Sequence, residues 1–244
     1  MRIAAVSDIH GNLGALEAVL TDVADQRVDL IVNLGDICSG PLQPQETLEL
    51  LRGLPVPTIA GNHERQLLTL PMEALRPSDE YAARSLTEEQ FGWLRDLPAT
   101  LRPVEDVLMV HGTVRSDIEY FLETVTHEGL RAATITEIEE RARGAEAPLI
   151  LCGHTHIPRQ VRFADGRLIV NPGSVGLPAY DDDRPFPHAV ETGSPQARYA
   201  IVTDSGGTWS AELRSIDYDW DAAVRLAIAN DRPDWARALA TGRI

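Results

Sequence analysis

Five short apolar segments constrain the fold of this 244-residue chain more than any other feature of its sequence. They are Ile3–Val6, Leu30–Val32, Val56–Ala60, Val107–Val110 and Leu149–Cys152. Short, nearly continuous apolar runs are typical of strands that are covered on both faces. Amphipathic segments lie between them. The sequence therefore predicts an α/β fold in which two packed mixed β-sheets are flanked by helices, a four-layer αββα sandwich.

Capping residues and apolar periodicity predict where the helices begin. Leu13, Leu16, Leu20 and Val23 fall on one helical face, and Asn12 stands where an N-cap is expected. Pro44 suits the first turn of a helix that runs to about residue 52. Capping boxes predict helices over 88–96 and 135–143, and apolar spacing predicts two more over 219–230 and 234–240.

The later part of the chain has a different pattern, dominated by turns. Alternating apolar residues around Asp165-Gly166 predict one hairpin, and residues 199–213 predict a second. Residues 172–198 are rich in Pro, Gly and Asp and predict one long irregular stretch, either a functional loop or a disordered one. No clean boundary divides the chain, so we expect a single domain over residues 1–244, closed by the second hairpin and two helices over 199–244.

Composition excludes several classes of protein. Lys and Arg number 22 against 37 Asp and Glu, a formal net charge of −15. A protein that binds duplex nucleic acid or an anionic membrane normally carries a basic patch, so neither partner is expected. No apolar run has the length of a membrane span or a secretory signal. Only Cys38 and Cys152 are present, which we expect to be small buried residues of a reduced, cytoplasmic protein.

Polar residues of the metal-ligating types follow each of the five apolar segments. In chain order they are Asp8 and His10, Asp36, Asn62 with His63 and Glu64, His111, and His154 with His156. In open α/β sheets, ligands bind outside the carboxyl ends of the strands. One such residue is usually a turn or a hydrogen-bonded core residue. Five of the seven histidines at strand ends instead predict one shared site.

These motifs resemble the five ordered motifs of the calcineurin-like metallophosphoesterase superfamily. They are Asp8-x-His10, Gly35-Asp36, Gly61-Asn62-His63-Glu64, His111-Gly112 and Gly153-His154-Thr155-His156, and the match spans residues 1 to about 175. Asn171-Pro172-Gly173-Ser174 also resembles a segment of small bacterial members. The resemblance implies that Asp8, His10 and His156 hold one metal and that Asn62, His111 and His154 hold a second. It further implies that Asp36 bridges both ions and that His63 acts on the leaving group.

The mixed donor set suits Mn²⁺, Fe or Zn²⁺ better than Ca²⁺, and Mn²⁺ is the expected ion. Two such ions share a hydroxide that attacks phosphorus in line, and they make the site locally positive on an acidic protein. The resemblance thus implies a two-metal phosphoester hydrolase. No arginine cluster is evident to bind a dianionic monoester, which favours a phosphodiesterase acting on small substrates, nucleotides among them.

Several alternatives stay open. The hydrolase could be a phosphomonoesterase or a protein phosphatase, or the chain could be a non-catalytic binding scaffold like the related retromer subunit. Candidate substrate contacts are Asn12, which also fits an N-cap, and Arg65, which also fits an ordinary surface residue. Arg184 is the third candidate, in a segment with Tyr180, Asp181, Asp182, Asp183 and His188 that fits either a lid or a solvated face. His127 lies outside every motif, so a structural role is expected for it.

Overall fold

The computed structural model describes all 244 residues, which form eight α-helices and thirteen β-strands. The helices are α1 (Leu13–Asp25), α2 (Pro44–Arg52), α3 (Asn62–Thr69), α4 (Pro77–Ser85), α5 (Glu88–Arg95), α6 (Ile135–Arg141), α7 (Trp220–Ala229) and α8 (Pro233–Thr241). The strands are β1 (Arg2–Val6), β2 (Leu30–Asn33), β3 (Thr100–Val104), β4 (Val107–Val110), β5 (Glu123–Thr126), β6 (Gly129–Ala132), β7 (Leu149–Leu151), β8 (Arg159–Arg162), β9 (Leu168–Asn171), β10 (Ala179–Asp182), β11 (His188–Glu191), β12 (Ala197–Asp204) and β13 (Trp209–Ile216).

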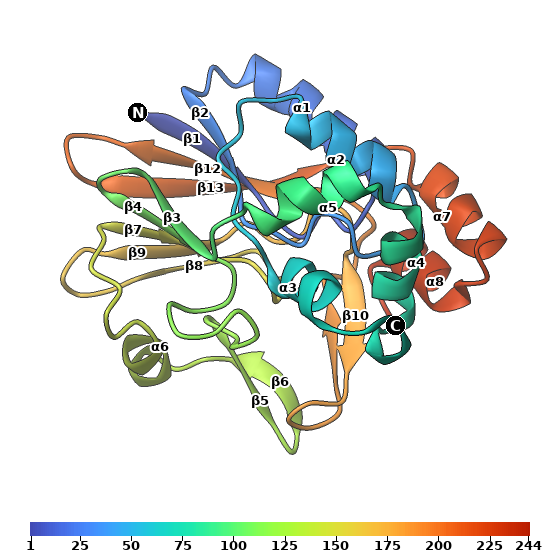
Figure 1. Cartoon of the computed structure of the whole chain (residues 1–244). Coiled ribbons are helices and arrows are strands. Elements are labelled where there is room, and N and C mark those ends of the chain that lie inside the picture. The colour runs from blue at the N-terminus through green and yellow to red at the C-terminus, as the bar shows by residue number, and fades with distance from the viewer.

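Two mixed sheets form the centre of the molecule (Figure 1). The first has the strand order β13-β12-β1-β2, with β1 parallel to β2 and antiparallel to β12. The second has the order β3-β4-β7-β9-β8, in which β4, β7 and β9 are parallel and the two outer strands are antiparallel to their neighbours. The predicted pair of mixed sheets is confirmed.

Alternation along the buried strands explains why their sequences are apolar at every position. In β1, Ile3 and Ala5 pack between the two sheets, whereas Ala4 and Val6 pack outward under α1 and α2. In β4, Met109 faces the first sheet and Leu108 faces outward toward α6. Because both faces of these two strands are covered, Ile3–Val6 and Val107–Val110 are apolar throughout. The predicted four layers, helix, sheet, sheet and helix, are therefore confirmed (Figure 1).

The predicted helix starts are also observed. The Asn12 side chain accepts a hydrogen bond from the backbone N–H of Ala15 and caps α1. Thr87 and Thr134 form the capping boxes of α5 and α6. Both predicted hairpins, β8–β9 and β12–β13, and both C-terminal helices are present. None of the helices combines the length and apolar character needed to cross a bilayer.

Two predictions about secondary structure are wrong. Val56–Ala60 is not a strand, because Pro57 has no N–H to donate and the segment makes only one isolated parallel bridge, between Asn33 and Thr58. Residues 172–198 are not irregular throughout, because β10 and β11 pair as an antiparallel hairpin within them. The sequence pattern also gave no indication of α3, α4, β3, or the β5–β6 hairpin beside which β10–β11 lies (Figure 1).

Candidate metal centre

The backbone turns sharply at the ends of the strands that carry the predicted ligands. Five of the seven non-glycine residues with positive φ are predicted metal ligands: Asp8 (54°), His10 (53°), Asp36 (56°), His154 (68°) and His156 (58°). L-residues rarely adopt this left-handed conformation, which tends to persist only where the surrounding structure enforces it, and such residues cluster at functional sites. Here the turns direct side chains from β1, β2 and β7 into one buried basin.

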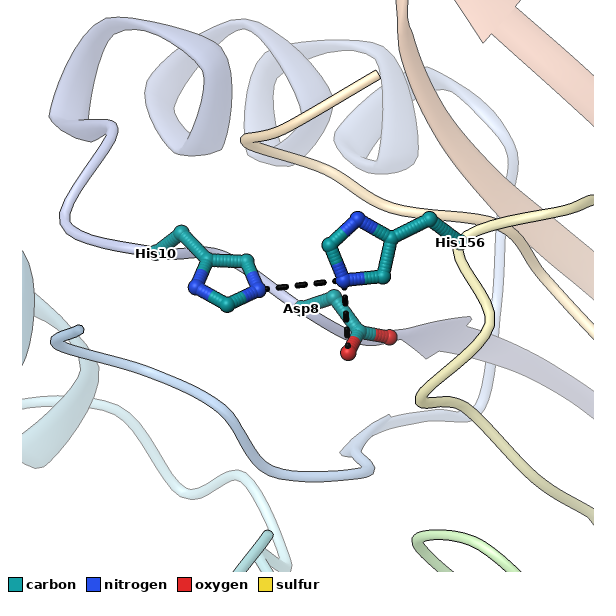
Figure 2. A group of neighbouring side chains, drawn as sticks. All are labelled: Asp8, His10 and His156. Atoms are coloured by element: carbon teal, nitrogen blue, oxygen red, sulfur yellow. Dashed lines mark hydrogen bonds and ion pairs between the residues drawn. The ribbon is translucent and has the colours of Figure 1, made fainter. Parts of the chain in front are cut away.

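One group of donors consists of Asp8, His10 and His156, all buried (Figure 2). The two imidazole Nε2 atoms lie 3.1 Å apart, and His156 Nε2 lies 3.3 Å from Asp8 Oδ1. His10 Nδ1 lies 2.7 Å from the Ser39 carbonyl oxygen, and His156 Nδ1 lies 2.7 Å from that of Leu177. Because a carbonyl oxygen only accepts, each Nδ1 must carry the hydrogen, and each Nε2 presents a lone pair to the basin. We call these three residues the first cluster.

The second cluster consists of Asp36, His111 and His154. His111 Nε2 lies 3.0 Å from Asp36 Oδ2 and 3.1 Å from Asn62 Oδ1. Its Nδ1 lies 2.7 Å from the Leu34 carbonyl oxygen, so again Nε2 faces the basin. The two clusters adjoin, since His111 Nε2 is 4.0 Å from Asp8 Oδ1 in the first cluster.

The donor arrangement suits a cation. In the first cluster two imidazole lone pairs and a carboxylate oxygen converge, and Asp8 Oδ1 is buried without a hydrogen-bond donor. Burial lowers the pKa of His10 to about 3 and that of His154 to about 4, so both rings stay neutral and able to bind a metal. Burial also tends to lower the pKa of His111, but the Asp36 and Asp8 carboxylates outweigh burial and raise it to about 10. The two carboxylates therefore favour positive charge in this basin. The residues fit two divalent ions.

Glu64 and Gly61 position the loop that carries Asp36. Glu64 is fully buried, and its carboxylate accepts hydrogen bonds of 2.8 Å from the backbone N–H groups of Asp36, Ile37 and Gly61. A Cβ at Gly61 would lie 2.2 Å from Asp36 Oδ1, so only glycine allows this approach. Glu64 belongs to a motif seen in the sequence, but its part in joining the two loops was not predicted.

His63 lies beside both clusters without joining either. Its Nε2 is 4.0 Å from Asp36 Oδ2, and its ring centroid is 5.4 Å from that of His10. Its Nδ1 is 2.7 Å from Oδ1 of Asp79, a buried residue of α4. Burial lowers the pKa of His63, but the Asp36 and Asp79 carboxylates outweigh burial and raise it to about 9. No sequence motif surrounds Asp79, so only the fold reveals this contact.

The three candidate substrate residues lie in different surroundings. Asn12 also donates from Nδ2 to the Gly176 carbonyl oxygen, so its hydrogen bonds are structural. Arg65 forms a two-pronged ion pair with Asp117, with N···O distances of 2.6 and 3.0 Å. Arg184 projects from the β10–β11 connection with 83% of its side chain exposed, and its nearest acid is Asp183 at 3.9 Å. A phosphate contact by any of them stays a prediction.

The hairpin β10–β11 forms part of the wall around the second cluster. Tyr180 of β10 donates to the His154 carbonyl oxygen at 3.2 Å, and its hydroxyl lies 2.8 Å from that of Tyr120. Tyr120 also lies 2.9 Å from Nε2 of His188 in β11. The sequence singled out Tyr180 and His188 only as members of a lid or a solvated face, and Tyr120 was missed. His127, expected to be structural, stacks on Phe186 with ring centroids 3.7 Å apart.

Comparison with known proteins agrees with the resemblance read from the motifs. The sequence profile of the calcineurin-like phosphoesterase superfamily domain matches residues 1–192, and the chain belongs to this superfamily. The crystal structure of a metallophosphoesterase from Sphaerobacter thermophilus is 29% identical in sequence, with a TM-score of 0.77 over 99% of each chain. A hypothetical protein from Pyrococcus horikoshii OT3 shares the fold, with a TM-score of 0.75 and 18% identity over 99% of this chain and 98% of that one. An uncharacterised protein from Methanocaldococcus jannaschii is 27% identical over 252 residues, 96% of this chain and 94% of its own.

Proposed function

We propose that this protein hydrolyses phosphoesters with two divalent metal ions, one held by each cluster. Asp8, His10 and His156 would hold the first ion, Asn62, His111 and His154 the second, and Asp36 both. The observation that carries the proposal is the convergence of two adjoining donor sets, in which the Nε2 atoms of His10, His156 and His111 face inward. Manganese is the proposed ion, with iron and zinc as the other metals that this donor set suits.

When bound, the two ions would supply a hydroxide nucleophile at neutral pH and offset the charge of the phosphoryl group. The side chains around them have separate tasks in this proposal. Asp79 holds the His63 ring by its Nδ1–H, which leaves Nε2 directed toward the basin. The Asp36 and Asp79 carboxylates raise the pKa of His63 to about 9 in the metal-free protein, and in this proposal the ring carries the proton that it donates to the departing oxygen.

The ion pairs of Arg65 and Arg76 support phosphodiesters over phosphomonoesters as the substrates. Arg65 is already paired with Asp117, and Arg76 lies 3.6 Å from both Asp182 and Asp183. Neither arginine is free to add positive charge for a dianionic monoester. A diester carries one charge on its phosphate and depends more on protonation of its leaving group. We therefore propose small phosphodiesters, nucleotide diesters among them, as the substrates.

Hydrolysis of bis-p-nitrophenyl phosphate, compared with p-nitrophenyl phosphate, tests this function. The purified protein is stripped of metal with a chelator and assayed with Mn²⁺, Fe²⁺ or Zn²⁺, and bound metal is counted by elemental analysis. We expect two ions per chain, turnover that depends on added metal, and a higher kcat/KM for the diester. Turnover of neither ester with any of the three metals would instead support a binding scaffold, and faster turnover of the monoester would overturn the diester preference.

A further inference from the structure

The last 52 residues of the chain lie outside the matched family domain, which ends at residue 192, yet two of their side chains contact residues in or beside the candidate metal centre. These residues, 193–244, include the helix pair α7 and α8, which packs near α4 (Figure 1). The two side chains are Arg232, in the connection between the helices, and Trp235, in the first turn of α8.

Trp235 is packed against the segment that orients His10. Its ring centroid lies 6.0 Å from that of His10, and the two rings meet at 75°. Only 6% of Trp235 is exposed. A Cβ at Gly40 would lie 2.8 Å from the Trp235 ring and 2.3 Å from the His10 carbonyl oxygen, so this backbone is held tightly between the two. The preceding residue, Ser39, provides the carbonyl oxygen that accepts the His10 Nδ1–H.

Arg232 joins the same helix pair to the segment that orients His63. Its guanidinium lies over the Trp235 ring, 5.6 Å from the centroid, and is paired with Asp234 at 2.6 Å. Its Nη1 donates to the Ser78 hydroxyl at 2.9 Å. Ser78 directly precedes Asp79, whose carboxylate bonds the His63 ring.

We propose that Trp235 and Arg232 are positioning residues: Trp235 fixes His10 for the first metal, and Arg232 fixes Asp79 and therefore His63. This inference rests on the proposed two-metal function. Partners that orient a ligand without touching the metal typically change metal affinity or activity by about 10–100-fold. The two residues act on different steps, so their substitutions separate metal binding from leaving-group departure.

A Mn²⁺ titration by calorimetry tests the role of Trp235. In Trp235→Leu we expect one of the two binding steps to weaken by about 10-fold or more, with the other step unchanged. Trp235→Phe keeps an aromatic edge against His10 and is expected to restore the weakened step. Trp220→Leu, on α7, is the matched control, because its ring contacts Tyr218 rather than a ligand. Thermal melting confirms that each variant is folded.

A comparison of two diesters tests the role of Arg232. In Arg232→Met we expect unchanged Mn²⁺ binding, with a larger loss of kcat on diphenyl phosphate, whose leaving group is poor, than on bis-p-nitrophenyl phosphate. Arg225→Met is the control, because Arg225 is 69% exposed and is paired only with Asp219. Equal losses on both substrates would show a merely structural role for Arg232.

The outcomes distinguish this inference from the proposed function. If the unmodified protein binds none of Mn²⁺, Fe²⁺ and Zn²⁺, or hydrolyses neither diester with any of them, the proposed function fails. If it does both, and Trp235→Leu binds both ions as tightly as the unmodified protein, the positioning role of Trp235 is wrong while the function stands.

Discussion

The two donor clusters differ in how firmly their side chains are held. In the first cluster both imidazoles are anchored through Nδ1 to backbone carbonyl oxygens, and all three residues are buried. In the second cluster His111 is anchored in the same way, but the His154 ring makes no hydrogen bond and is partly exposed. The first cluster is therefore held by more hydrogen bonds, whereas one ring of the second cluster has no hydrogen bond to fix its orientation.

If each cluster binds an ion as proposed, this difference predicts that the two ions are held with different affinity. A ligand that is fixed before metal binding loses little conformational freedom on binding, so the first cluster is expected to bind its ion more tightly. Partial exposure of His154 places the second cluster nearer to solvent. We expect the second ion to exchange more readily and to lie on the side where substrate enters.

The largest expected effect comes from removing the carboxylate that the two clusters are proposed to share. Asp36→Asn should lose both ions and lower turnover by more than the ~10–100-fold seen when an outer partner is removed. Metal content and kcat on bis-p-nitrophenyl phosphate measure this. Asp165→Asn, a half-exposed aspartate paired with Arg167, controls for contaminating phosphatases. An Asp36→Asn protein that retains one ion per chain would show that Asp36 serves a single cluster.

The next largest effect concerns a residue that belongs to neither cluster. His63→Ala should keep both ions while kcat falls by about 10²–10⁴-fold, the usual contribution of a general acid. The loss should be greatest for diesters with poor leaving groups. Asp79→Asn should give a smaller loss in the same pattern, because it releases the His63 ring without removing it. Loss of metal in His63→Ala would mean that His63 is a ligand instead.

Single-ligand variants test the difference between the clusters directly. His10→Ala should weaken the tighter of two Mn²⁺ binding steps, and His154→Ala should weaken the other step. Each change is expected to weaken its own step by at least ~10-fold and to leave the other within a few-fold. Calorimetry of the two variants beside the unmodified protein measures both steps. The reverse assignment would refute the greater preorganisation of the first cluster.

The smallest effect is on the stability of the metal-free protein at different pH values. Burial lowers the pKa of His10 to about 3 in the folded protein, whereas its ordinary value is 6.5. Between these two pH values the His10 ring of the unfolded chain binds a proton that the folded protein does not. Stability should therefore fall as the pH drops from 6.5 toward 4. The Asp36 and Asp8 carboxylates raise the pKa of His111 to about 10 in the folded protein. The stability that the protonated His111 ring contributes is therefore fully present below pH 6.5 and is lost as the pH rises through 10.

Urea denaturation of the metal-free protein across this range measures both limbs. His10→Asn should flatten the acid limb, and His111→Asn should flatten the alkaline limb, with each variant leaving the opposite limb in place. If His10→Asn leaves the acid limb as steep as before, burial of His10 is not its cause.

The sequence predicted those parts of the fold that depend on local patterns. Continuous apolar runs mark β1, β4 and β7 because these strands are covered on both faces, and each is followed directly by its polar residues. The apolar run Val56–Ala60 does not form a strand, because Pro57 has no backbone N–H to donate. An apolar pattern gives no information about missing backbone donors. The cytoplasmic location and the single-domain organisation stay predictions.

The second layer of the site depends on contacts between residues far apart in the chain. Asp79 meets His63 from a helix that no pattern marked, and Trp235 meets His10 across 225 positions. Tyr120 approaches His154 from a loop and Tyr180 from strand β10, in two segments whose sequences showed no regular pattern. Six of the seven proposed ligands follow a strand end, where one local rule applies, and Asn62 begins α3. The residues that support them are set by how the helices and hairpins pack together.

The left-handed turns at five of the seven proposed ligands have a consequence for engineering. Aspartate and histidine are among the few residues other than glycine that tolerate this geometry. A graft that copied only the seven side chains onto regular helices or strands would aim them in other directions. Transplanting this centre into a new scaffold therefore requires its bends as well as its donors, together with the glycines that let neighbouring loops approach.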